Sequence, residues 1–556
     1  METRSAKRRK MLSLKYRILT AEGGQGGIDH ISNLPDDVLH RILGFLPIET
    51  IARMSILSKR WTQIWRSFPD LDFTTIRQKN PDQLKVMDNL VRSMSRLHRF
   101  DRQRVRNFLY LCDRDFIRDV LSVRDKGSNL RALRVGAFLS FTCLNKLIRE
   151  ALKQNVRELD IEFATEDYFN MPKCIILSES LRVLNFKPQF PGFRLPFLSV
   201  MKGGFQSPLQ VLSLSLMLIE GELDIFTDSV FPVLRKLSLS EFMHLRQIKV
   251  SCSALEDMTL EKCSELDTLE VVGSRLERLR VASCFHSLRG KSMVKVHAAR
   301  LRVLEWEQNH LTEDCLLQNL TALHQASLYG LTKFHEFAPP AIKLRAAWNF
   351  LHGLCHVQCL KLDTPCMKLL QQLAEKNYGP LLPFINLETL ELRTVLTRNN
   401  IVPALDLLFK SSPSLCSLIL TNTDYCSYER SERKVLRSVR AHSQVSFRIP
   451  YPDHNPVYLV DKDWWDATSL EEEKNWETQM TAMTSFLEKL KVVKIHGFSG
   501  CKGDVSLAKF LLRHGKALEE IVLCYGNERN SLLEKKIKSQ MMEFSAAASS
   551  AKILFE

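Results

Sequence analysis

The sequence contains no long apolar run: nowhere in its 556 residues do 18 apolar side chains follow one another. A helix that crosses a bilayer needs about 20 such residues, so we expect no membrane-spanning segment and no membrane partner. The N-terminus is basic and polar and lacks the apolar segment of a secretory signal peptide. We therefore interpret the 14 cysteines as reduced core thiols rather than as a disulfide framework.

Catalytic signatures are also missing. The sequence has no GxSxG motif, no HExxH motif and no phosphate-binding Gly-Lys motif. Asp463 and Asp466 are paired carboxylates, but such pairs are too common to indicate catalysis without a cleft. The glycines within 23–27 follow no predicted strand, so they do not form a dinucleotide-binding turn. We expect a protein that is not an enzyme and needs no cofactor.

One cluster has a spacing that could bind a metal ion. His352, Cys355, His356 and Cys359 offer four potential zinc ligands. They run from the end of a predicted helix into a predicted strand, a path along which four side chains rarely converge on one tetrahedral ion. Packing within a repeat is the favoured interpretation, and we expect no metal site.

Positive charge is in excess, with 78 Lys and Arg against 63 Asp and Glu and a formal net charge of +15. Part of this excess lies in the first 20 residues. The run Lys7, Arg8, Arg9 and Lys10 is typical of a nuclear localisation signal, and a solvated disordered tail is an equal alternative. We therefore expect the protein in the nucleus, the cytoplasm or both. A glycine-rich stretch at 22–27 predicts a flexible linker.

Residues 33–68 read NLPDDVLHRILGFLPIETIARMSILSKRWTQIWRSF and predict three short helices. Asn33 is the predicted N-cap of the first helix, and Ser58 can cap the third. Four apolar residues recur at i, i+3, i+4 and i+7 and predict one apolar stripe: Leu39, Ile42, Leu43 and Leu46. A unit of roughly 40 residues buries little of its own apolar surface, so we expect this stripe to be exposed or half-exposed for a partner.

The order of these features closely resembles the F-box, and near Lys59-Arg60-Trp61 the plant branch of that family. The resemblance implies docking to a Skp-type adaptor and, through it, to a cullin in an SCF-type ubiquitin ligase. The adaptor-binding residues that it implies are Leu34, Pro35, Val38, Leu39, Ile42, Leu43, Leu46 and Trp61. An ordinary three-helix subdomain is the alternative.

From about residue 105 one motif returns: apolar, two residues, apolar, one residue, apolar. Its alternation predicts a strand with one buried face, and its period of roughly 25 residues in the first five copies matches leucine-rich repeats. Helical segments are predicted between copies, at 144–152, 342–351, 367–373 and 403–409. The central apolar residues are Leu133, Leu159, Leu184, Leu212, Leu237, Leu304, Leu360, Leu390 and Leu418. The predicted fold class is α/β: an F-box followed by a leucine-rich-repeat solenoid with parallel strands on its concave face and helices on its convex face.

Within 245–284 the motif recurs at a spacing of about 10 residues, which is too short for a strand, a helix and two turns. We predict that two such units form one short coil of about 20 residues, with an extended piece in place of the convex helix. Cys263 and Cys284 fall at the repeat position where a small side chain fits beneath the turn.

Residues 486–523 resemble the FBD module that ends many plant F-box/leucine-rich-repeat proteins, on Leu490, Val493, Gly497-Phe498 and the closing run at 518–523. They predict a strand, a helix at 505–512 and a second strand, which can cap the solenoid. The arginines of 84–108 offer a nucleic-acid-binding stripe, but a solvated helix face is favoured, so a nucleic-acid partner is not expected.

The predicted domains are a basic tail and linker at 1–28, an F-box at 29–75, a leucine-rich-repeat array at 76–425, an irregular insertion at 426–485 and an FBD-like cap at 486–556. The resemblance implies the substrate-recognition subunit of an SCF-type ligase, which captures a protein substrate through the repeats. A non-ligase repeat scaffold, such as a nuclear anion-binding protein, is the alternative. A receptor gated by a small molecule ranks lower, because no repeat carries a dense Arg/Lys cluster on its strand face.

Overall fold

The structure is a computed structural model of the whole chain. It describes residues 31, 34–74, 114–125, 127–164, 169–189, 193–195, 207–263, 265–285, 291–331, 341–375, 383–394, 402–422, 487–498, 502–525, 531–548 and 550–556. The basic run at 7–10, the arginine-rich stretch at 84–108 and the whole predicted insertion at 426–485, with Asp463 and Asp466, lie outside these residues.

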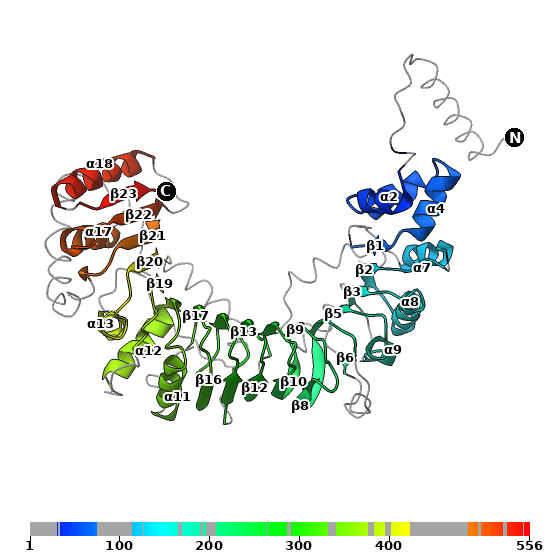
Figure 1. Cartoon of the computed structure of the whole chain (residues 1–556), viewed down its shortest axis with the longest axis horizontal. Coiled ribbons are helices and arrows are strands. Elements are labelled where there is room, and N and C mark those ends of the chain that lie inside the picture. Colours follow the sequence, from blue (N-terminus) through cyan, green and yellow to red (C-terminus); the bar gives the residue numbers. More distant parts are fainter. Residues whose placement is uncertain are drawn as a thin grey trace, which may run out of the picture.

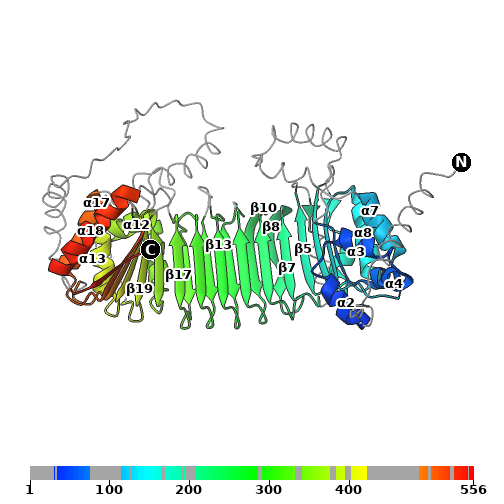
Figure 2. The ribbon, with the colours of Figure 1, turned by 90° about the horizontal axis from the view of Figure 1, so that it is seen from above.

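Stacked coils form a curved solenoid whose concave face is a single 16-stranded sheet (Figures 1 and 2). Every neighbouring pair in this sheet is parallel, as the repeat pattern predicted. In order across the sheet the strands are β1 (Asp70–Asp72), β2 (Ala132–Phe138), β3 (Glu158–Ala164), β5 (Val183–Pro188), β7 (Val211–Ser215), β9 (Lys236–Ser240), β11 (Asp257–Glu261), β13 (Arg278–Ala282), β15 (Val303–Glu307), β17 (Gln325–Tyr329), β18 (Cys359–Asp363), β19 (Thr389–Thr394), β20 (Ser417–Asn422), β21 (Val492–Phe498), β22 (Glu520–Tyr525) and β23 (Lys552–Phe555).

The nine central leucines of the predicted copies are all buried, none more than 5% exposed. They also align from strand to strand: Leu133 pairs in register with Leu159, and Leu360 with Leu390. This confirms the solenoid, because each leucine packs on its equivalents in the two neighbouring coils.

The convex side is helical at both ends of the solenoid and a second sheet in its middle (Figure 1). The helices after the N-terminal unit are α7 (Arg114–Val123), α8 (Phe141–Lys153), α9 (Lys173–Ile176), α11 (Ala341–His352), α12 (Thr364–Glu375), α13 (Val402–Ser411), α17 (Lys502–His514) and α18 (Ser531–Ala548). The convex strands are β4 (Phe169–Asn170), β6 (Phe193–Arg194), β8 (Met217–Thr227), β10 (Met243–Ser251), β12 (Thr268–Val272), β14 (Met293–His297) and β16 (Asp314–Gln318). The four helices predicted between copies correspond to α8, α11, α12 and α13.

The short coil predicted within 245–284 is confirmed, since Asp257 of β11 pairs in register with Arg278 of β13. Convex strands are not confined to 245–284, however: they run from β4 to β16. The expectation of convex helices in the other coils of the middle of the solenoid was therefore wrong. Longer coils also use strands there, as β8 shows. In its second half Leu223 and Ile225 are buried on either side of the partly exposed Asp224, and Phe226 is buried as well. The spacing of two between Leu223 and Ile225 is that of a strand.

The turn position of the middle coils carries small, fully buried side chains, as predicted for Cys263 and Cys284. Asn309 occupies the same place one coil later. Its Oδ1 accepts a hydrogen bond from the Cys284 amide at 2.8 Å, and its Nδ2 donates to the carbonyl of Val281 at 2.9 Å. These side chains satisfy backbone groups that the tight turn leaves without partners in the sheet.

At the C-terminal end the predicted strand–helix–strand unit is present as β21, α17 and β22. A further helix and strand, α18 and β23, extend the array by one coil that the sequence patterns did not predict. Within the described residues, no helix is long and apolar enough to cross a membrane.

Candidate functional site

The N-terminal unit consists of the helices α2 (Asp36–Leu43), α3 (Ile48–Met54) and α4 (Lys59–Ser67). Pro35 occupies the N-cap position of α2 and makes no side-chain cap bond, so the prediction that Asn33 is the N-cap was wrong. The predicted cap of α4 is confirmed, since the Ser58 hydroxyl accepts a hydrogen bond from the amide of Trp61 at 3.2 Å.

The predicted stripe does not form one face of α2: its first three residues divide between two sides of the helix, and Leu46 lies beyond the end of α2. Leu39 and Leu43 are each only 2% exposed and belong to the core, so the expectation that they are exposed was wrong. Ile42 and Leu46 are 47% and 39% exposed. A helix turns about 100° per residue, so Leu39 and Leu43 lie one above the other toward α4 while Ile42 points to the side.

The most exposed apolar side chains of the unit lie in its two turns. Phe45, after α2, is 90% exposed; Ile56 and Leu57, between α3 and α4, are 84% and 62% exposed. The sequence analysis missed these three residues because it followed helical periodicity. The signal that could have found them is large apolar side chains in short turns, where polar residues are usual.

The other residues implied by the resemblance lie between these extremes. Pro35 is exposed, whereas Leu34, Val38 and Trp61 are half-buried. Leu34 and Trp61 pack against the core. The exposed apolar residues of the unit are therefore Ile42, Phe45, Leu46, Ile56 and Leu57, with Pro35 before the start of α2.

Polar contacts hold α2 against α4. The Arg60 guanidinium forms an ion pair with Asp36 at 2.8 Å and donates to the carbonyl of Leu34. His40 Nε2 lies 3.2 Å from the carbonyl of Ile64, and its ring meets Phe68 edge-on at 5.7 Å. The Arg60–Asp36 pair is exposed, so its contribution to stability is small.

A charged cluster lies on the concave face where β13 to β19 run side by side (Figure 2). Arg280 pairs with Glu305 at 3.0 Å and with Glu307 at 2.9 Å. Burial alone would lower the pKa of the Arg280 guanidinium, but these carboxylates outweigh it and raise the pKa. The cation therefore stays charged at any physiological pH, and it neutralises much of the negative charge on β15.

The other half of this concave cluster is built around Tyr329. The Arg393 guanidinium lies 4.4 Å from the centre of the Tyr329 ring, and Glu391 pairs with Lys361 at 2.8 Å and with Arg393 at 3.4 Å. Burial raises the pKa of the Tyr329 hydroxyl, which has no hydrogen-bond partner within the described part of the chain. Stacked Tyr and Arg side chains are typical of energetically dominant positions in protein interfaces.

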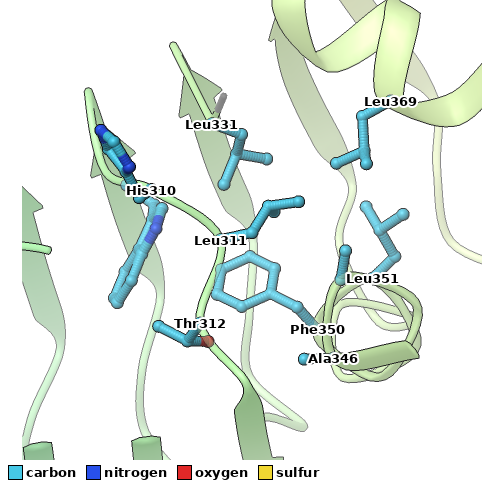
Figure 3. Close-up of a pocket in the computed structure, with 10 residues that line it drawn as sticks. His310, Leu311, Thr312, Leu331, Ala346, Phe350, Leu351 and Leu369 are labelled. Atoms are coloured by element: carbon cyan, nitrogen blue, oxygen red, sulfur yellow. The ribbon is translucent and has the colours of Figure 1, made fainter. Parts of the chain in front are cut away.

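A pocket lies where the convex sheet gives way to helices (Figure 3). Leu311 and Leu331 face Phe350 and Leu351 of α11 across it. Its cavity of about 20 Å³ holds no more than a single water molecule, whereas small-molecule sites span roughly 300 Å³ or more. We interpret it as a packing defect at the junction and not as a ligand site.

The histidine–cysteine cluster at 352–359 forms no metal site in the described structure, in which no group of three His, Cys, Asp or Glu side chains is placed to hold an ion. His352 ends α11, with its ring 4.7 Å from the ring of Trp348. Its Nε2 is buried without a partner among the described residues, and burial lowers its pKa.

Comparison with known proteins supports both resemblances. Residues 31–72 match the F-box domain family, and residues 483–523 match the FBD family. An F-box/FBD/LRR-repeat protein of Arabidopsis thaliana is 37% identical over 567 aligned residues, which cover 100% of both chains. An F-box/LRR-repeat protein of that plant is 25% identical over 72% of this chain and 74% of its own length. A second F-box/FBD/LRR-repeat protein is 24% identical over 74% of each chain.

Proposed function

Because the chain belongs to the plant F-box/FBD/leucine-rich-repeat family, we propose that it is the substrate-recognition subunit of an SCF-type ubiquitin ligase. F-box domains generally bind Skp-type adaptors. In this chain the adaptor docks on the N-terminal unit and, through the adaptor, the chain joins a cullin. A protein substrate binds the concave face of the repeats.

The observation that carries the proposal is the exposure of Phe45, Ile56 and Leu57 in the F-box. Large apolar side chains that stay exposed in turns contribute no hydrophobic burial to the stability of the isolated chain. Exposed apolar side chains grouped on a surface usually mark a protein interface. They lie within the segment that matches the F-box family. Their burial against an adaptor would contribute about 25 cal/mol for each Å² of apolar area removed from water.

Substrate binding is assigned to the concave cluster, centred on Tyr329 and Arg393. Its charges are already paired within the chain, so a partner must match their arrangement and does not simply neutralise them. Such pairs contribute more to the choice of partner than to affinity. The anchor for affinity is the Tyr329–Arg393 stack.

The chain itself carries out no chemistry in this proposal. It holds a substrate near the ubiquitin donor of the ligase and so raises the effective concentration of the reacting groups. The lack of catalytic motifs in the sequence and the adaptor role typical of F-box/leucine-rich-repeat proteins support this assignment. A thioester between ubiquitin and any cysteine of this chain would contradict it.

Co-purification with a Skp-type adaptor tests the proposal. We expect Phe45→Ser and Ile56→Ser each to weaken adaptor binding by at least about tenfold, or roughly 1.4 kcal/mol. Val272→Ser is the matched control, since Val272 is a 44% exposed apolar residue on the convex sheet. Unchanged adaptor binding in both F-box variants, or an equal loss with Val272→Ser, would contradict the docking assignment.

We also propose that Lys7, Arg8, Arg9 and Lys10 direct part of the protein to the nucleus, with the remainder in the cytoplasm. The run of four basic residues supports this. Replacing all four by alanine in a fluorescent fusion should shift the protein to the cytoplasm. An unchanged distribution would leave the run as a solvated tail.

A further inference from the structure

The last strand of the concave sheet is paired on one side only in the described structure. β23 pairs in parallel with β22, with Glu520 opposite Lys552 and Leu523 opposite Phe555. Within the described part of the chain no strand pairs with the opposite side of β23, which is the edge of the 16-stranded sheet. Such edges present a row of unpaired backbone donors and acceptors.

The core residues of this coil are incompletely covered. Ile553 and Phe555 continue the rows of Ile521 and Leu523, which are both 0% exposed. Ile553 and Phe555 are only half-buried. The core positions of β23 therefore stay apolar while they remain partly exposed in the described structure.

Within the described residues, the backbone of β23 has hydrogen-bonding groups without a strand partner at two positions. The amides of Lys552 and Glu556 donate to the carbonyls of Glu519, just before β22, at 2.9 Å and of Leu523 in β22 at 3.0 Å. Backbone groups alternate between the two sides of a strand, so those of Ile553 and Phe555 point to the open side. An added antiparallel strand can exchange both of its hydrogen bonds with each of these two residues.

The sequence of the strand is complementary to itself when it is reversed. It reads Lys552-Ile553-Leu554-Phe555-Glu556. In an antiparallel pair centred on Leu554, Lys552 lies opposite Glu556 of the second copy, and Ile553 lies opposite Phe555. Opposite charges and apolar side chains therefore meet across the pair, and both combinations stabilise neighbouring strands. A parallel pair in register would instead place lysine beside lysine.

We propose that β23 is a dimerisation edge on which a second copy of this chain adds its own β23 in the antiparallel direction. The two-fold axis passes beside Leu554, and the concave sheets of the two copies become continuous. Such an interface is isologous and closes at two subunits. The F-boxes lie at the opposite ends of the two solenoids, so each remains accessible to an adaptor (Figure 1).

The Glu556 carboxylate already has partners within the chain. It accepts from Lys494 of β21 at 2.8 Å and from the Cys524 thiol of β22 at 3.4 Å. Both partners lie on the paired side of β23, so the carboxylate must turn toward the open edge, or be shared, when Lys552 of the second copy arrives.

Sedimentation velocity of the full-length chain tests the proposal. Every protein carries Phe45→Ser, so that association through the exposed F-box residues is not counted. We expect a monomer–dimer equilibrium between about 1 and 100 µM, and a dissociation constant at least about tenfold higher with Lys552→Glu. Lys236→Glu is the matched control, because Lys236 is an exposed lysine on β9, inside the sheet, and should leave the equilibrium unchanged.

Cross-linking gives a second test that does not depend on the stability of the charge variant. Leu554→Cys places two thiols opposite each other at a non-hydrogen-bonded pair, with Cα atoms about 4.5 Å apart, within disulfide range. With copper phenanthroline as oxidant, this variant should form a disulfide-linked dimer, and the unchanged chain and Lys236→Cys should not. A chain that stays monomeric at about 100 µM overturns the proposal. A dimer whose dissociation constant is unchanged by Lys552→Glu and that forms no cross-link at residue 554 also overturns it. Binding of other proteins, but not of a second copy, at this edge overturns it as well.

Discussion

Nε of Arg124 lies 2.9 Å from Oε1 of Gln154, and the same guanidinium donates to the backbone carbonyl of Phe68. Phe68 follows the last F-box helix, and Gln154 follows the helix of the first repeat. Arg124 is 6% exposed, and burial lowers its pKa to about 10, so it remains charged at neutral pH. It therefore joins the F-box and the first coil through one buried cation.

We expect Arg124→Met to destabilise this junction by about 1–3 kcal/mol, because the carbonyl of Phe68 loses its charged donor. Hydrogen exchange should accelerate first around residues 66–74. Arg118→Met, at an exposed arginine of α7, the helix that ends just before Arg124, should change stability by less than about 0.5 kcal/mol. Equal effects of the two substitutions would contradict the role given to Arg124.

Leu237→Ala should lower the free energy of unfolding by about 2–5 kcal/mol, because Leu237 is 1% exposed and packs between adjacent coils. Chemical denaturation measures this loss. Hydrogen exchange should show the damage mainly in the neighbouring coils, since each repeat contacts only its neighbours. Val233→Ala, at a residue 42% exposed, is the control and should have little effect.

Asn309→Ala should cost about 2–4 kcal/mol, because it leaves the Cys284 amide and the Val281 carbonyl buried without partners. Asn309→Asp keeps the acceptor for the amide but loses the donor to the carbonyl and buries a charge. It should therefore not restore stability. A wild-type melting temperature for Asn309→Ala would show that water replaces the side chain.

His352 should make the protein less stable in mild acid. Its folded-state pKa is lowered by burial, so the unfolded chain binds a proton more readily. Above the unfolded-state pKa of about 6.5 the imidazole is neutral in both states, and burying it has no proton-linked cost. As pH falls through that value the unfolded chain binds the proton first, so the folded state loses stability. His352→Phe should reduce the difference in stability between pH 7.5 and pH 5.5 relative to wild type. An undiminished difference would assign the acid sensitivity to other histidines.

Substitutions in the two proposed surfaces should affect adaptor binding and substrate binding independently. Arg393→Ala removes the cation above Tyr329 and a partner of Glu391, so it should lose the proteins captured after proteasome inhibition but keep the adaptor. Phe45→Ser should do the reverse. Deleting residues 1–70 is a weaker test, because it also removes Phe68 and the start of β1, which pairs with the first repeat strand. Simultaneous loss of both partners in either variant would contradict two separate surfaces.

The sequence alone determined those elements that depend on residues near one another in the chain. Leu237 and its equivalents recur with a strand-like alternation, at a period of roughly 25 residues in the first five copies, and stacking in register follows from that repetition. The short coil within 245–284 followed from length alone, since no helix fits in it. The F-box and FBD segments were recognisable because their turns, caps and apolar spacing are set by neighbouring residues.

Only the tertiary structure decided which apolar residues face outward. Helical spacing grouped Leu39 and Leu43 with Ile42, but packing against α4 buried the first two, and the turns exposed Phe45 and Ile56. Arg124, Gln154 and Phe68 meet over separations of 30 and 56 residues that no local pattern reports. The open edge of β23 likewise depends on its place in the sheet. Burial and pairing are properties of what surrounds a residue, and in a solenoid the neighbouring coil supplies much of that environment.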